Sequence, residues 1–252
     1  MRKPKAARVS SITIGIFCCL VLCIASASWA KRSFTGVPKD AKDEIGSAQT
    51  QGQTDQPDTL EAYARKAKEK GETKVQFSTP IYEYAGVRTL EEARTYSRIA
   101  LVNVIAAKSY VSGPRTILTW YKFKILEDLS RGSYFCFKCA AFSDPPPDML
   151  PVNSDEILVP KAGGSVTIDG VEITSDEHNF PQFSKSQTYL LFFGLDESRR
   201  LAMITLGPQG VFVIDEAGHL AGVNQRDSLL KRELKENHKN SLGDVKKHLK
   251  RN

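Results

Sequence analysis

Residues alternate between two faces along residues 116–126, and the neighbouring residues 99–110 are rich in Val, Ile and Leu with few charges. Both are rich in β-branched and aromatic residues. A period of two is typical of a strand with one buried face. Residues 112–115 (Ser-Gly-Pro-Arg) lie between the two stretches and have turn chemistry. The pattern therefore predicts a β-hairpin, the clearest local structure in the chain.

Shorter strand-like segments follow, each bounded by glycine, proline or polar residues. We expect strands at residues 75–77, 81–84, 156–160, 165–168, 171–174, 188–193, 201–206 and 211–214. Asp169 and Gly170 separate two of them and suit a two-residue hairpin turn. Short strands at this spacing predict a mainly β fold, namely a small closed or partly open antiparallel barrel.

Short helices are expected at the borders of this β region. Thr59 can cap a helix that ends before Gly71, and Thr89 with Glu92 forms a capping box. Leucine and valine residues recur at helical spacing in residues 229–234 and 242–249, which predicts two more helices near the C-terminus.

The first thirty residues have the layout of an export signal. Four cations in residues 1–8 precede an uncharged, largely apolar run over residues 9–30. This order is typical of a signal peptide or an uncleaved signal anchor with a transmembrane helix at residues 9–29. Small residues at 25–27 and 28–30 favour cleavage, whereas Lys31 and Arg32 favour retention. Both alternatives predict an exported protein, periplasmic or extracellular, that contacts a membrane if the segment is retained.

Four regions are predicted from these patterns. Residues 1–30 are the signal peptide or anchor, and residues 31–72 are a flexible tether with a short helix. Residues 73–225 form the β-barrel domain, with residues 131–155 as an inserted loop that contains three consecutive prolines. Residues 226–252 form a basic helical tail.

Charge is concentrated at the two ends of the chain. The formal net charge is +6, yet residues 31–225 hold 22 Lys/Arg against 25 Asp/Glu. A nucleic-acid-binding domain would carry its basic residues on the folded body, so no nucleic acid partner is expected. The tail holds nine Lys/Arg against four Asp/Glu. It could be a solvated helix on the barrel, a contact for an anionic surface or acidic partner, or disordered. The candidate contacts are Lys231, Arg232, Lys235, Lys246, Lys247, Lys250 and Arg251.

Candidate chemistry is sparse. Cys136 and Cys139 are the two cysteines outside the leader, and they lie among aromatic residues. A local disulfide or two inert thiols fit this setting, while thiol exchange or metal binding remain alternatives. His178 lies in the acidic segment 176–179, for which a solvated loop is expected. The chain shows no hydrolase, zinc-protease or nucleotide-binding signature, and we predict no cofactor, no metal site and no catalytic residue.

A set of motifs also resembles a known class. They are residues 125–132, 157–160, 163–164, 180–183 and 188–193, which read Ile-Leu-Glu-Asp-Leu-Ser-Arg-Gly, Ile-Leu-Val-Pro, Gly-Gly, Phe-Pro-Gln-Phe and Thr-Tyr-Leu-Leu-Phe-Phe. Their order resembles secreted bacterial proteins of unknown function and netrin-module barrels, although Ser186 stands where that pattern prefers glycine. The resemblance implies a barrel like the oligonucleotide/oligosaccharide-binding (OB) fold. Protease inhibition in that class uses an N-terminal cysteine and several disulfides, which this chain lacks, so inhibition is not implied.

These patterns favour a non-enzymatic binding or interaction module that works outside the cytoplasm, with an unidentified protein or polymer as its ligand. The alternatives are an envelope enzyme, of thiol-disulfide or hydrolytic type, and a surface-associated protein that binds acidic partners through its tail.

Overall fold

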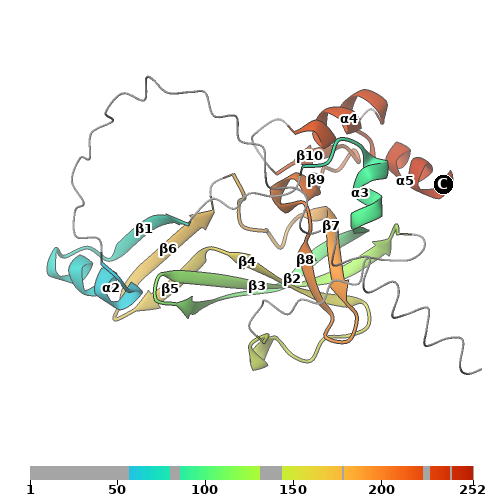
Figure 1. Cartoon of the computed structure of the whole chain (residues 1–252). Helices are drawn as coiled ribbons and strands as arrows, with labels where there is room; N and C mark the ends of the chain where they lie inside the picture. Colours follow the sequence, from blue (N-terminus) through green and yellow to red (C-terminus); the bar gives the residue numbers. More distant parts are fainter. Residues whose placement is uncertain are drawn as a thin grey trace, which may run out of the picture. The chain divides into compact units, whose positions relative to one another are not determined.

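The computed structural model describes residues 57–79, 86–130, 144–177, 179–223, 228–238 and 240–251, all within the unit Asp55–Asn252. This part of the chain is mainly β, with two sheets and short helices (Figure 1), which confirms the predicted class. The predicted signal or anchor, most of the tether and the strand at 81–84 lie outside the described residues. Among the residues described, no helix has the length and apolar character needed to cross a membrane.

The larger sheet has seven strands in the order β10-β9-β7-β2-β3-β4-β8. Strand β8 pairs with β4 at one residue pair and also with β7 along four, so it connects both sides of the central hairpin. The bounds are β2 (Arg98–Gly113), β3 (Thr116–Asp128), β4 (Glu156–Ala162), β7 (Thr188–Asp196), β8 (Leu201–Ile204), β9 (Val211–Ile214) and β10 (Leu220–Gly222).

The predicted hairpin is confirmed as β2 and β3, the two longest strands. They pair along almost their whole length, with register shifts after Leu101, Val104 and Val111. On its other side β2 pairs with β7 over Arg98–Asn103, that is, over the first part of its length.

The smaller sheet has the order β1-β6-β5 and consists of β1 (Lys74–Thr79), β5 (Gly164–Ile168) and β6 (Val171–Glu177). The turn between β5 and β6 is at Asp169 and Gly170, with φ of 50° and 82°, as its sequence predicts. Strand β1 runs parallel to β6. The sequence analysis placed these strands in one barrel domain with the others. Periodicity identifies a strand, but it does not reveal which strand is its partner.

Glycines at 163 and 164 allow the chain to pass from one sheet to the other. Both have positive φ, 89° and 130°. A Cβ on Gly164 would overlap the Thr119 and Ser109 hydroxyls, and one on Gly163 would lie 2.6 Å from the Ser175 carbonyl oxygen. Only glycine fits at both positions, because the backbone here lies directly on the face of the hairpin.

Helices cover the sheets at two places. Helix α2 (Leu60–Glu69), capped by Thr59, packs Leu60, Ala64 and Ala67 on the smaller sheet. Helices α3 (Leu90–Tyr96), α4 (Leu229–Asn237) and α5 (Leu242–Arg251) lie beside β7, β9 and β10 (Figure 1). Two short 3₁₀ helices, η1 (Pro147–Met149) and η2 (Gly207–Gly210), complete the described elements.

Two apolar layers lie on opposite faces of the central strands. Successive residues of β2 belong to different layers. The inner layer contains Ala100, Val102 and Val104. The outer layer, which faces α3, α4 and α5, contains Ile99 and Leu101. Four tail residues are buried in the outer layer: Leu230, Leu234, Val245 and Leu249. The C-terminal segment thus forms ordered helices packed on the larger sheet.

The capping box predicted at Thr89 is present in a shifted form. The Glu92 amide donates to the Thr89 hydroxyl at 3.1 Å. The Glu92 carboxylate accepts from the amide of Arg88, one residue before the cap, at 2.8 Å. Both bonds satisfy amides at the start of α3.

Candidate functional site

An open cleft lies where the turn end of the β2–β3 hairpin meets the smaller sheet. Its volume is about 700 Å³. The lining comes from residues 107–111 of β2, Thr119 and Tyr121 of β3, residues 164–167 of β5, and Gln182 with Phe183 from the segment before β7. Segments far apart in the sequence therefore meet around one space.

The register of the hairpin places the polar floor of the cleft. Ser109 lies opposite Thr119, and Ala107 opposite Tyr121, so the four side chains share one face. The Ser109 and Thr119 hydroxyl oxygens are 2.8 Å apart, and Thr119 donates to the carbonyl oxygen of Gly163 at 2.6 Å. The amide of Ser165 donates to the Ser109 hydroxyl at 3.3 Å. Hydroxyl groups thus hold β5 against the hairpin.

Residues 180–183, which carry part of the resemblance, close the inner core beside the cleft. The Phe183 ring packs edge-on against Tyr121 and Phe123, with centroids 4.9 and 5.1 Å away, and against Tyr189 at 5.1 Å. Edge-to-face geometry of this kind adds to the stabilisation from burial alone. Phe183 therefore fixes the position of its neighbour Gln182.

Gln182 carries a donor that lacks a partner. Its Oε1 accepts a hydrogen bond from the Tyr121 hydroxyl. Its buried Nε2 has no hydrogen-bond partner among the described residues. Burial raises the pKa of Tyr121 to about 12, so this hydroxyl keeps its proton and donates at any ordinary pH. This Nε2 packs beside Gly163 and Ser175, where a buried amide donor without a partner is costly.

A buried lysine lies beside the cleft floor, on the face that carries Thr119. Lys161 of β4 is opposite Thr119 and 4 % exposed. Its Nζ lies 3.9 Å from the carboxylate of Glu177 on β6, 4.7 Å from the centre of the Phe180 ring, and donates to the carbonyl oxygen of Ala162 at 3.0 Å. Burial lowers the pKa of Lys161 to about 8, against the opposing effect of Glu177 and Asp176. The pair links the larger sheet to the smaller one.

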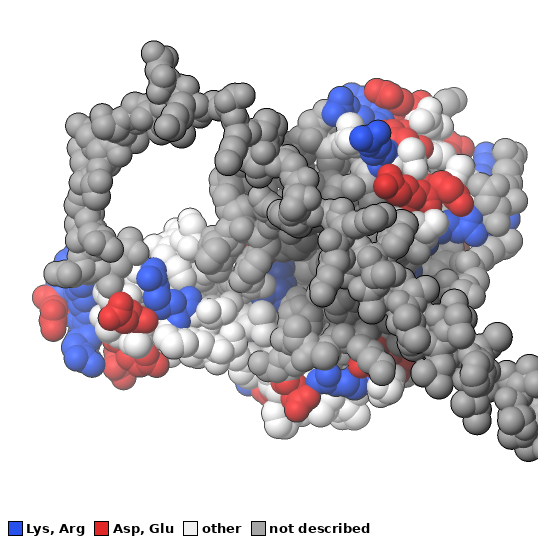
Figure 2. Space-filling model, viewed as in Figure 1, with Lys and Arg blue, Asp and Glu red and all other residues white. Residues whose placement is uncertain are grey.

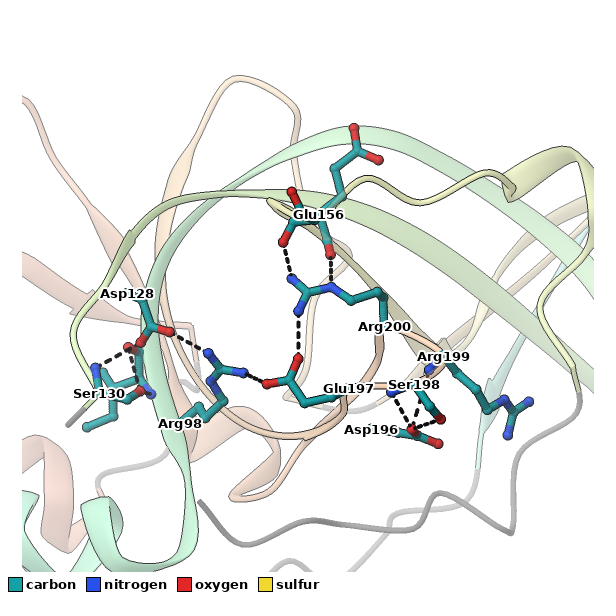
Figure 3. A network of polar contacts seen from close by, with 11 residues as sticks. Arg98, Asp128, Ser130, Glu156, Asp196, Glu197, Ser198, Arg199 and Arg200 are labelled. Atoms are coloured by element: carbon teal, nitrogen blue, oxygen red, sulfur yellow. Dashed lines mark hydrogen bonds and ion pairs between the residues drawn. The ribbon is translucent and has the colours of Figure 1, made fainter. Parts of the chain in front are cut away.

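The other end of the hairpin carries a network of ion pairs (Figure 3). Arg98 of β2 lies between the carboxylates of Asp128 and Glu197. Arg200 pairs with Glu197 at 2.8 Å and donates to the carbonyl oxygens of Glu156 and Ser154 at 3.0 and 2.7 Å. Arginine forks that contact carboxylates and carbonyls from three segments act as a structural clamp.

The residues predicted as site candidates do not meet at the cleft. Cys136, Cys139 and His178 lie outside the described residues. In the tail, Lys246 pairs with Glu127 at 2.5 Å and Lys247 with Asp244 at 3.6 Å. The other described side chains, Lys231, Arg232, Lys235 and Lys250, lie on α4 and α5, while the Arg251 side chain is not described. Around these helices, red and blue atoms are interleaved on the face shown in Figure 2.

Sequence patterns did not identify the residues that the fold brings together here. Lys161 offered a signal, because it is the one charge within the apolar strand β4 after its first residue. Gln182, Gly163 and Gly164 were noted only as parts of a resemblance. Thr119 and Ser109 gave no signal at all, since hydroxyl residues are ordinary in strands.

No cluster of three or more metal-ligating side chains is present among the described residues. Comparison of the chain with protein-family models, with curated proteins and with solved structures found no match.

Proposed function

We propose that this protein is a non-enzymatic binding module that works outside the cytoplasm and takes its ligand into the cleft. The observation that carries the proposal is the open cleft of about 700 Å³, whose lining comes from both sheets and from the segment before β7. A volume of this size is in the range of pockets that bind small ligands. Such pockets typically carry a small number of polar atoms that orient the ligand.

The chemistry of the lining favours binding. Its one charged side chain is Lys108, which pairs with Asp148. Its other polar groups are the hydroxyls of Ser109, Tyr110, Thr119 and Tyr121, the Gln182 amide and the hydroxyls of β5, which donate and accept hydrogen bonds without a charge. Such a lining suits a ligand with low charge and many hydrogen-bonding groups.

The export part of the proposal is supported by the leader alone. Four cations before an uncharged run of about twenty residues fit a signal peptide or anchor. A reporter that is active only outside the cytoplasm should therefore work when it is fused after residue 60. If only a cytoplasmic reporter is active in the same fusion, this part of the proposal is wrong.

We also propose that β2, β3, β4, β8 and β7 form an OB-like barrel. The support is that β7 pairs with both β2 and β8, while β8 reaches β4 through Leu158 and Leu201. The resemblance noted for residues 180–193 agrees with this arrangement.

The binding proposal is tested by filling the cleft. Ala107 is exposed and lines the cleft, so Ala107→Trp places an indole in the space. Ala221→Trp on β10 is a matched control at another exposed strand alanine. Immobilised full chain and both variants should be screened against peptide and glycan arrays. Ligands that bind the natural chain and the control, but not Ala107→Trp, support the proposal, whereas equal binding by all three contradicts it.

A further inference from the structure

We propose that the ligand is an extended peptide that adds as a strand to the free edge of β2, meaning the β7-side edge of residues 104–113. This inference rests on the proposed binding function and names the class of its ligand.

The free edge of β2 follows from the pairing. Strand β3 accompanies β2 almost to Gly113, but β7 pairs only with Arg98–Asn103. Beyond Asn103 this side of β2 has no strand partner among the described residues. Backbone amides and carbonyls of alternate residues point sideways along such an edge and need partners. A peptide backbone offers donors and acceptors at the matching spacing, which a glycan does not.

A second unpaired edge borders the same cleft. Strand β5 pairs with β6 on one side. On its other side, the amide of Ser165 donates to the Ser109 side chain rather than to a strand. Residues of both edges line the cleft.

Alternate side chains of an added strand would point into the cleft. They would lie on the face that carries Ala107 and Ser109. The charge of Lys108 on the edge is already matched by Asp148, so the cleft does not select for acidic peptides.

Two features restrict where a strand can be added. A register shift at Val104 and Ala106 leaves Ile105 without a residue opposite it on β3, and the shift before Gly113 distorts the other end. Bulges of this kind interrupt pairing along an edge. The regular stretch between them is residues 106–111, which is also where β2 borders the cleft. The structure thus points to a short, defined register.

The experiment starts with peptide selection. A display library of random peptides of about ten residues, enough to span this stretch at roughly 3.3 Å per residue, is selected on the immobilised full chain. Selected sequences should be rich in β-branched residues and poor in proline, and they should bind Ala107→Trp at least tenfold more weakly than the natural chain or the Ala221→Trp control.

Backbone methylation of a selected peptide then tests strand addition directly. An N-methyl group removes one backbone donor and blocks the edge it lies on. Methylation at one set of alternate residues should abolish binding, and methylation at the other set should leave it within about threefold, because only one edge of the added strand faces β2.

The outcomes separate this inference from the proposed function. If glycans bind, peptides do not, and Ala107→Trp blocks the glycans, the cleft is a binding site but strand addition is wrong. If a peptide binds in the cleft but tolerates methylation at every position, strand addition is again wrong. If no ligand of either kind is sensitive to Ala107→Trp, both proposals fail.

Discussion

The two ends of the β2–β3 hairpin differ in how far their strand edges are paired and their faces covered. At the end near Arg98, guanidinium groups reach carboxylates and carbonyls of three segments, and α3, α4 and α5 cover the outer face. At the end near Ser109, the edges of β2 and β5 lack strand partners within the described chain and border an open cleft. The covered end therefore provides stability, whereas the unpaired strand edges are available for contacts with something else.

The largest loss of stability is expected at the covered end of the hairpin, meaning the end near Arg98, where the outer layer is buried under α3, α4 and α5. Leu230 of α4 is fully buried, while its neighbour Leu229 is 46 % exposed. Leu230→Ala removes side-chain contacts from the outer layer and leaves a cavity, so the free energy of unfolding should fall by about 3 kcal/mol. Leu229→Ala should change it by less than about 0.5 kcal/mol. Urea unfolding of both variants measures the difference.

Equal small losses in these two variants would show that the C-terminal helices do not stabilise the sheet. The covered end would then contribute no more to the free energy of unfolding than the cleft end.

The second effect is a pH dependence at the cleft end. Burial lowers the pKa of Lys161 to about 8, whereas in the unfolded chain it returns to 10.5. Above pH 8 the unfolded chain therefore holds a proton that the folded chain has released, so the free energy of unfolding rises with pH. The gain between pH 8 and about pH 9.5 should be about 1.5 kcal/mol, because the slope at pH 8 is half of its full value of about 1.4 kcal/mol per pH unit.

The matched control for this pH dependence is the double variant Lys161→Met, Glu177→Gln, which removes both charges together. Its unfolding free energy should be flatter over the same range. Measurements stop below the range in which tyrosines begin to titrate, because Tyr121 acts with the opposite sign. A natural chain whose stability is as flat as that of the double variant would refute the buried-lysine interpretation.

The third effect is the loss of the clamp at the covered end. The Arg98 side chain is 12 % exposed, but its partners Asp128 and Glu197 are 33 % and 58 % exposed. Solvent screening reduces the effect, so Arg98→Met should lower the free energy of unfolding by about 1 to 2 kcal/mol. The exposed pair Arg199–Asp144 is the control, and Arg199→Met should cost less than about 0.5 kcal/mol. Similar losses in thermal or urea unfolding would mean that the network in Figure 3 is no more than a set of surface ion pairs.

The sequence predicted the elements of this fold better than its site, for a physical reason. Periodicity and turn residues identified β2, β3, the turn at Asp169 and the cap at Thr89, because these depend on local interactions. They did not separate the smaller sheet, because the parallel pairing of β1 with β6 joins residues about a hundred positions apart. The cleft depends on the same long-range step. Ser109, Gln182 and Ser165 are unremarkable alone and meet only when β5 crosses the hairpin at Gly164.

The smallest expected effect tests whether the cleft end is open space. Ala107 is exposed at the cleft, whereas Ala202 of β8 is fully buried in the inner layer. An indole at residue 107 enters a solvent-filled space, so Ala107→Trp should change the free energy of unfolding by less than about 0.5 kcal/mol. Ala202→Trp must displace packed side chains and should cost at least about 1 to 3 kcal/mol. If Ala107→Trp destabilises the protein as much as Ala202→Trp, the region around residue 107 is packed, and the contrast between the two ends of the hairpin does not hold. If it is neutral, the same variant can test ligand binding without disturbing the fold.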